Sequence, residues 1–202
     1  MPPDQRPIPR FAAEPPHDSF PYGRWGEQLG ERFLEACGRV ESDEEIGRPE
    51  QITWFPERTF EGRTYVPATA PTPEGFELFG FVSFVRGEDG EPGEFYSRAD
   101  YTDETADANP DWKLDLSDDE IGTWSGPRNL SASIALVWGV SLVPGGALAT
   151  AELGPTTTDQ CEVVEDRFTL VSLDGWTGDL LAVRLWGGSA NELASESLYE
   201  DE

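Results

Sequence analysis

One stretch, FELFGFVSFVR at residues 76–86, constrains the fold more than any other part of the chain. Successive side chains of a strand point to opposite faces of its sheet, and both faces are apolar here. One face carries Phe76, Leu78, Val82 and Phe84, and the other carries Phe79, Phe81 and Val85. Such a strand is typical of the centre of a sheet that is covered on both sides. The stretch therefore predicts a central strand between two layers.

Most of the chain after residue 50 has the same β character. QITWF at 51–55 and RTFEGRTYV at 58–66 read as strands that Pro56 divides. The turn GEDGEPG leads from the central strand into EFYSRADY at 94–101, which alternates apolar and polar residues. We expect these two strands to form a hairpin whose second strand has one solvated face.

The second half predicts a further hairpin and a meander. SASIALVWGVSLV at 131–143 turns at Pro144-Gly145-Gly146 into ALATAEL at 147–153, whose alanines either admit a neighbouring element or line a cavity. Short strands then follow at 161–164, 167–173 and 179–186, separated by Glu165-Asp166 and Asp174-Gly175, and their spacing favours a meander. The segment 101–130 is polar, and Ser117 with Glu120 forms a capping pattern that allows about one helical turn.

One helix is expected, at residues 24–40. Trp25, Leu29, Phe33, Cys37 and Val40 recur at helical spacing and form one apolar stripe. Its two glycines weaken the helix in isolation, so it needs tertiary packing.

The fold class is therefore α+β: one N-terminal amphipathic helix on a mostly antiparallel sheet, closed as a sandwich or barrel. We expect an extended proline-rich arm at 1–23, which is either a disordered tail or an arm along a neighbouring subunit. A single domain follows at 24–188, with its helix at 24–40 and its β-rich part at 51–188. Residues 189–202 complete the chain as an acidic tail or a short helix.

The charge excludes several partners. Lys and Arg number 14 against 40 Asp and Glu, which gives a net charge of −26. Binding to a phosphate backbone or to an anionic membrane surface needs clustered basic residues, so neither nucleic acid nor membrane is expected. The charge admits a basic protein partner, but a halophile-like or generally solubilising surface explains it equally well.

Cysteine use and the N-terminus bear on location. Cys37 and Cys161 are too few for a disulfide scaffold, and whether they pair with each other is open. The chain has no apolar run long enough for a membrane span and no signal-like N-terminal stretch, so we expect a cytoplasmic protein.

Few catalytic residue types are present. His17, the only histidine, lies in the proline-rich arm, which excludes a Ser-His-Asp triad and histidine-ligated metals in the folded part. Lys113, the only lysine, stands among carboxylates that favour its ammonium form, the wrong state for a nucleophile. The common nucleotide-binding glycine loops are absent. The sequence therefore assigns no catalytic, cofactor-binding or metal-binding residue and no cofactor, and whether the chain is an enzyme stays uncertain, with the balance against it.

Carboxylate chemistry is what remains. Paired acids hydrolyse glycosides and tryptophans stack on sugars, but Trp54, Trp124, Trp138, Trp176 and Trp186 are more often core residues. An acidic loop with Asp103, Asp107, Asn109 and Asp111 has oxygen ligands suited to calcium, but it lacks the EF-hand spacing. The nine carboxylates between Asp100 and Glu120 also suggest mimicry of a phosphate backbone, for which a solvated surface is the simpler explanation.

Our first hypothesis is an acidic, non-enzymatic protein-interaction domain, such as an accessory, immunity-like, inhibitor-like or assembly component. It would bind a protein partner, basic or otherwise, or further copies of itself as a homo-oligomer. The alternative is a small-ligand-binding β-barrel or a carboxylate-dependent hydrolase, which requires an apolar pocket rimmed by a buried acid or a cleft that holds two carboxyl groups.

Overall fold

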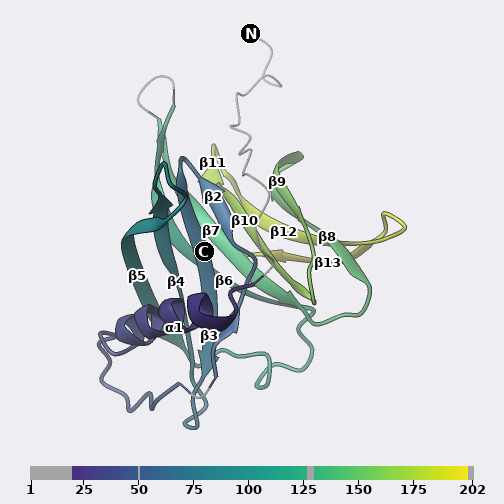
Figure 1. Cartoon of the computed structure of the whole chain (residues 1–202). Helices are drawn as coiled ribbons and strands as arrows, with labels where there is room; N and C mark the ends of the chain where they lie inside the picture. Colours follow the sequence, from purple (N-terminus) through teal and green to yellow (C-terminus); the bar gives the residue numbers. More distant parts are fainter. Residues whose placement is uncertain (1–19, 50, 127–129, 200–202) are drawn as a thin grey trace.

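The computed structural model describes residues 20–49, 51–126 and 130–199, so nearly all of the predicted arm, including His17, lies outside the described residues. It has one described helix, α1 (Gly23–Cys37), followed by strands (Figure 1). The strands are β1 (Thr53–Trp54), β2 (Arg58–Phe60), β3 (Arg63–Pro71), β4 (Glu77–Arg86), β5 (Pro92–Thr102), β6 (Leu114–Ser125), β7 (Ser131–Ser141), β8 (Gly146–Leu153), β9 (Thr156–Glu162), β10 (Arg167–Leu173), β11 (Gly175–Trp176), β12 (Asp179–Gly187) and β13 (Glu192–Ser197). The predicted α+β class is confirmed.

The strands form three antiparallel sheets. The first sheet has the order β1-β3-β4-β5, with β2 also paired to β3. The second sheet has the order β10-β7-β6, and the third has the order β11-β12-β8-β9, with β13 paired to β12. In Figure 1, α1 lies across β3, β4 and β5 on one side of the first sheet, while the third sheet lies farthest from the helix.

The central strand of the first sheet is confirmed as two-faced. β4 pairs with β3 on one side and with β5 on the other, so the predicted hairpin 76–101 is also present. Val82 and Phe84 pack under α1, whereas Phe81 and Phe79 belong to the larger core shared with the second and third sheets. Apolar residues on both faces of β4 therefore join two separate cores.

The helix packs as its stripe predicts. Leu29, Phe33 and Ala36 are buried against the first sheet, and Trp25 lies edge-on to Phe84 with ring centroids 5.1 Å apart. The helix ends at Cys37 rather than at residue 40, with Gly38 following it. This 15-residue helix is the only one described, and no described helix is long and apolar enough to cross a membrane.

The predicted hairpin 131–153 and the meander after it are both wrong. β7 pairs with β6 and β10, while β8 pairs with β9 and β12, so the turn at Pro144-Gly145-Gly146 connects two different sheets. β9 lies in the third sheet, β10 returns to the second, and β12 returns to the third. Alternation of apolar residues identifies a strand and its buried face, but it does not identify the strand's neighbour.

Two polar segments also form strands that the sequence did not predict. Ser117 and Glu120 lie in β6, which pairs with β7 along its length, and no helical turn forms there. The C-terminal segment contains β13, paired with β12, where a tail or short helix was expected. In both segments backbone pairing with an apolar neighbour prevails over weak local preference.

Candidate functional sites

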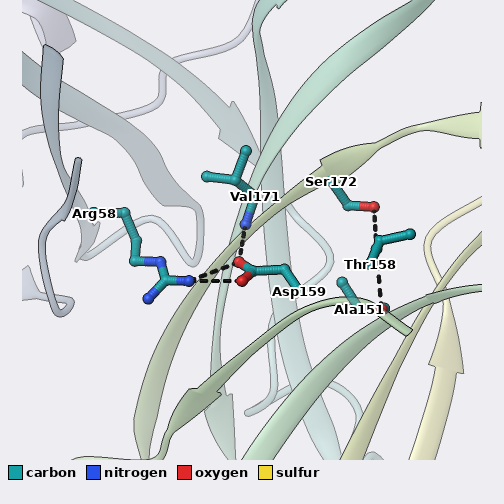
Figure 2. Close-up of polar contacts among 6 residues, drawn as sticks. All are labelled: Arg58, Ala151, Thr158, Asp159, Val171 and Ser172. Carbon is teal, nitrogen blue, oxygen red and sulfur yellow. Dashed lines mark hydrogen bonds and ion pairs between the residues drawn. The ribbon is translucent and has the colours of Figure 1, made fainter. Parts of the chain in front are cut away.

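Three sheet edges meet at a buried ion pair between Arg58 and Asp159. Arg58 belongs to β2 and Asp159 to β9, 101 residues apart, and both side chains are more than nine-tenths buried. Arg58 Nη2 donates to both carboxylate oxygens at 2.8 Å (Figure 2). The same carboxylate accepts the backbone N–H of Val171 in β10 at 2.8 Å. One carboxylate therefore joins the first, second and third sheets.

The edges of β9 and β10 lie side by side without a backbone ladder between them. Side chains of β9 satisfy the edge of β10 instead: Asp159 accepts from Val171, and the Cys161 sulfur hydrogen-bonds the backbone of Thr169. Thr158 and Ser172 share a 2.7 Å hydroxyl contact, and Thr158 is placed 3.0 Å from the carbonyl of Ala151 in β8 (Figure 2). An edge covered in this way does not recruit another strand.

Burial and charge act in opposite directions on the junction carboxyl. Burial raises the pKa of Asp159, while Arg58 and the N–H groups of Val171 and Gln160 lower it. Because every one of these partners donates to the carboxylate, the geometry favours the ionised form.

A pocket of about 310 Å³ adjoins the junction and is lined by residues before and within β2, β9 and β10. Two of its lining residues, Arg58 and Thr169, are 6% and 1% exposed. Neither Arg58 Nε nor Thr169 Oγ1 has a hydrogen-bond partner among the described residues. Two buried polar atoms without a partner among the described residues therefore belong to the lining of one pocket.

A second, smaller cavity of about 150 Å³ holds two carboxyl groups. Glu77 of β4 and Asp115 of β6 line it together with Thr69, Ser117 and Trp138. Burial and, to a smaller extent, the charge of Asp115 raise the pKa of Glu77 to about 7, against a hydrogen bond from Thr69 that lowers it. The pKa of Asp115 is also raised by burial. This is a cleft of the kind that the hydrolase alternative requires.

A third feature is a groove of about 610 Å³ beside β5, the last strand of the first sheet. Three arginines line it: Arg32 and Arg39 from the helical side, and Arg98 from β5, whose guanidinium is already paired with Asp119 at 2.7 Å. Arg39 Nη2 donates to the backbone oxygen of Ser97 at 3.3 Å and to its hydroxyl at 3.2 Å. Arg32 lies 3.8 Å above the ring of Phe95. The groove is basic in a chain of net charge −26.

The carbonyl of Ser97 lies on the open side of β5. The carbonyl of Tyr96 receives the Ser83 hydroxyl of β4, and a Cβ at Gly80 of β4 would overlap the carbonyl oxygen of Arg98. Carbonyls alternate in direction along a strand, so the carbonyl between these two points away from β4. No described strand pairs with β5 on that side.

The residues that the sequence singled out do not gather in one place. Cys37 and Cys161 are both free, and burial raises their thiol pKa values to about 11 and about 12. Trp138 and Trp176 are core residues, and Trp176 stacks edge-on with Trp124. Lys113 is exposed.

The acidic segment is not one exposed array. Asp118 accepts a 2.9 Å hydrogen bond from Tyr199, Asp119 pairs with Arg98 at 2.7 Å, and Asp115 lines the small cavity. Among the described residues, those of the loop from Asp103 to Asp111 included, no group of three or more His, Cys, Asp or Glu is placed to hold a metal ion.

Sequence reasoning missed all three features because each joins residues far apart in the chain. The groove was the feature that the sequence could best have indicated. Arg32 and Arg39 are seven residues apart, which places them on one side of the predicted helix, and basic residues are few in this chain. No protein-family model, curated protein or solved structure matches this chain.

Proposed function

We propose that the chain is a protein-interaction domain that receives an extended, acidic peptide segment along the open side of β5. The observation that carries this proposal is the position of the Ser97 carbonyl, which faces away from β4 beside the Arg39 guanidinium. An added strand would hydrogen-bond this edge, and its carboxylates would pair with the arginines of the groove.

The charge of the groove selects the partner. Arg32 and Arg39 supply its positive charge, because Arg98 is already paired with Asp119, and Glu35 is the single acid among the described residues that line it. The chain as a whole has a net charge of −26 and repels acidic segments, so the groove concentrates favourable contacts at one place. A partner that is basic overall remains compatible if the segment that docks is itself acidic.

Fluorescence anisotropy tests this proposal with a labelled peptide of alternating glutamate and valine, and with its lysine counterpart. We expect the glutamate peptide to bind and its affinity to fall as salt rises, because exposed charge pairs are screened. Arg39→Glu should abolish binding, while Arg24→Glu, the same change on an exposed part of α1 away from the groove, should leave it unchanged. Equal binding by the two variants, or preference for the lysine peptide, would contradict the proposal.

A second variant tests the strand-addition part. Ser97→Pro removes the outward N–H, which an edge strand tolerates but an added strand needs. We expect it to weaken peptide binding while Ser97→Ala does not, with both variants folded by circular dichroism. Binding that survives Ser97→Pro would leave charge alone as the basis and would refute strand addition.

A second candidate function is carboxylate-dependent hydrolysis at the small cavity. The observation that favours it is that Glu77, with a pKa of about 7, shares the cavity with Asp115. A protonated acid beside a second carboxyl group is the arrangement used to protonate a leaving group. Turnover of 4-nitrophenyl glycosides that Glu77→Gln and Asp115→Asn abolish, and that the exposed-turn control Glu88→Gln retains, would support it; no turnover by the unmodified chain would refute it.

A further inference from the structure

The pocket at the three-sheet junction has the features of a binding site that no part of the proposed function uses. It lies beside β2, β9 and β10, away from the groove at β5, and encloses about 310 Å³. That volume is at the lower end of the range for small-molecule sites. Its walls include the apolar side chains of Pro56 and Val164 and the buried thiol of Cys161.

Two residues that line this pocket each carry a buried donor atom that has no hydrogen-bond partner in the part of the chain that the structure describes. Arg58 binds Asp159 through Nη2, and in this end-on geometry Nε has no partner among the described residues. Thr169 Oγ1 also has no partner within residues 20–49, 51–126 and 130–199, although the residue is 1% exposed. A buried polar group without a partner costs free energy, and few such groups persist in a native protein without a reason. Two of them lining one cavity indicate a ligand that brings acceptor atoms.

The charges around the pocket define the ligand further. The positive charge of Arg58 is already balanced by Asp159, and the acids Glu57 and Glu162 also line the pocket. Glu57 is in turn 3.6 Å from Arg86, so its charge is compensated as well. An anion would therefore meet acidic side chains without a spare cation, and a cation would lie against the arginine. A neutral acceptor avoids both penalties.

The wall that presents these donors is fixed before any ligand arrives. Figure 2 shows the Asp159 carboxylate held between Arg58 and the Val171 N–H, with the Thr158–Ser172 pair on the neighbouring strands. Such pre-ordered donors lose little freedom when they bind.

From these observations we propose that the junction pocket binds a small neutral carbonyl compound, such as an amide with a short branched apolar group. Its oxygen accepts from Arg58 Nε and Thr169 Oγ1, and its apolar part lies against Pro56 and Val164.

Nuclear magnetic resonance titration of the ¹⁵N-labelled chain tests this with three probes of one shape and different charge: isobutyramide, isobutyrate and isobutylamine. We expect isobutyramide to bind most tightly and to shift the backbone signals of Cys161, Val164 and Thr169. Tighter or equal binding of isobutyrate or isobutylamine, or shifts confined to other parts of the chain, would overturn the proposal.

A single substitution provides a second test of the same proposal. Thr169→Val keeps the side-chain shape and removes the hydroxyl, so it should weaken isobutyramide binding about fivefold or more while the rest of the spectrum stays that of a folded chain. Thr123→Val, the same change at an exposed position of β6, serves as the control and should leave affinity unchanged. Unchanged affinity in Thr169→Val would also overturn the proposal. Neither test involves Arg39 or β5, so failure here is distinct from failure of the proposed function.

Discussion

Arg58 and Arg39 both hold a position at the edge of a sheet, but with opposite consequences. Arg58 is 6% exposed and bound to a carboxylate that also takes the N–H of a neighbouring strand, so the edges there are closed to further chains. Arg39 is exposed, and its side-chain hydrogen bonds among the described residues go to neutral oxygen atoms of Ser97, contacts that a carboxylate can replace. The difference shows that the surroundings of an arginine decide whether a sheet edge is closed to a further strand or stays open to one.

The largest expected effect is at the sealed junction. Arg58→Met leaves the Asp159 carboxylate buried with no charged partner, which should cost about 3–5 kcal/mol of the free energy of unfolding. Urea denaturation measures the loss. Asp159→Asn in the same chain should recover part of it, because an amide is less costly to bury than an unpaired charge and still accepts from Val171. A loss below about 1 kcal/mol would show that the junction is not sealed.

Glu77 is a buried acid that can be compared with Asp159, the acid that Arg58 binds. The pKa of Glu77 is about 7 in the folded chain against 4.5 ordinarily, so the folded state holds this proton more tightly than the unfolded state. Its contribution to stability is therefore complete below about pH 4.5 and is lost as the pH rises to about 7. Asp115 and Asp107 face it, and their charges act in the same direction.

Glu77→Gln should remove this pH dependence. We expect the variant to match the unmodified chain at about pH 4 and to exceed it by about 2 kcal/mol at about pH 8. The measurement is the difference between the two free energies of unfolding across that range, which cancels the contributions of the other acids. If the difference in the free energy of unfolding did not grow with pH, ionisation of Glu77 would not destabilise the fold, and Glu77 would resemble Asp159 in this respect.

Two threonines near the junction compare a satisfied hydroxyl with an unsatisfied one. Thr158 contacts Ser172 at 2.7 Å and the Ala151 carbonyl at 3.0 Å, so Thr158→Val should destabilise the fold by about 1 kcal/mol or more. Thr169 Oγ1 has no partner in the described part of the chain, so Thr169→Val should be neutral or stabilising by up to about 1 kcal/mol. The unfolding temperature should therefore fall in Thr158→Val and stay the same or rise in Thr169→Val, and a similar fall in both variants would show that the two hydroxyls are equivalent.

The sequence predicted best where one element determines its own environment. Residues 76–86 carry apolar side chains on both faces, and that pattern alone places β4 between two layers. The stripe from Trp25 to Cys37 similarly identifies the buried side of α1. Local periodicity is sufficient in such cases because the property being predicted is burial.

Prediction failed where the environment comes from a distant segment. β6 carries Asp118 and Asp119 inside a strand, which is tolerable because Tyr199 and Arg98 provide the compensating contacts. The partners Arg58 and Asp159 are 101 residues apart, and no spacing rule connects them. The order of strands across three sheets depends on the same kind of long-range pairing, so local pattern could give neither the true neighbours of β7 and β8 nor the candidate sites.

The smallest expected effect on stability is at the open edge. Arg39→Met removes two hydrogen bonds to Ser97 that are 3.2 and 3.3 Å long and exposed to water, so the free energy of unfolding should change by less than about 0.5 kcal/mol. The methionine keeps the aliphatic length of the side chain, and the apolar contacts that hold α1 through Leu29 and Phe33 are unaffected.

The same variant should lose affinity for the acidic peptide, because the charge that recognises a carboxylate is gone while the edge of β5 is still present. Urea denaturation and peptide anisotropy on one preparation give both values. A stability loss of about 2 kcal/mol or more would mean that Arg39 seals its edge as Arg58 does, and the contrast between the two arginines would fail. An unchanged stability with lost binding would place Arg39 at a surface used for recognition, since nothing in the fold then depends on its charge.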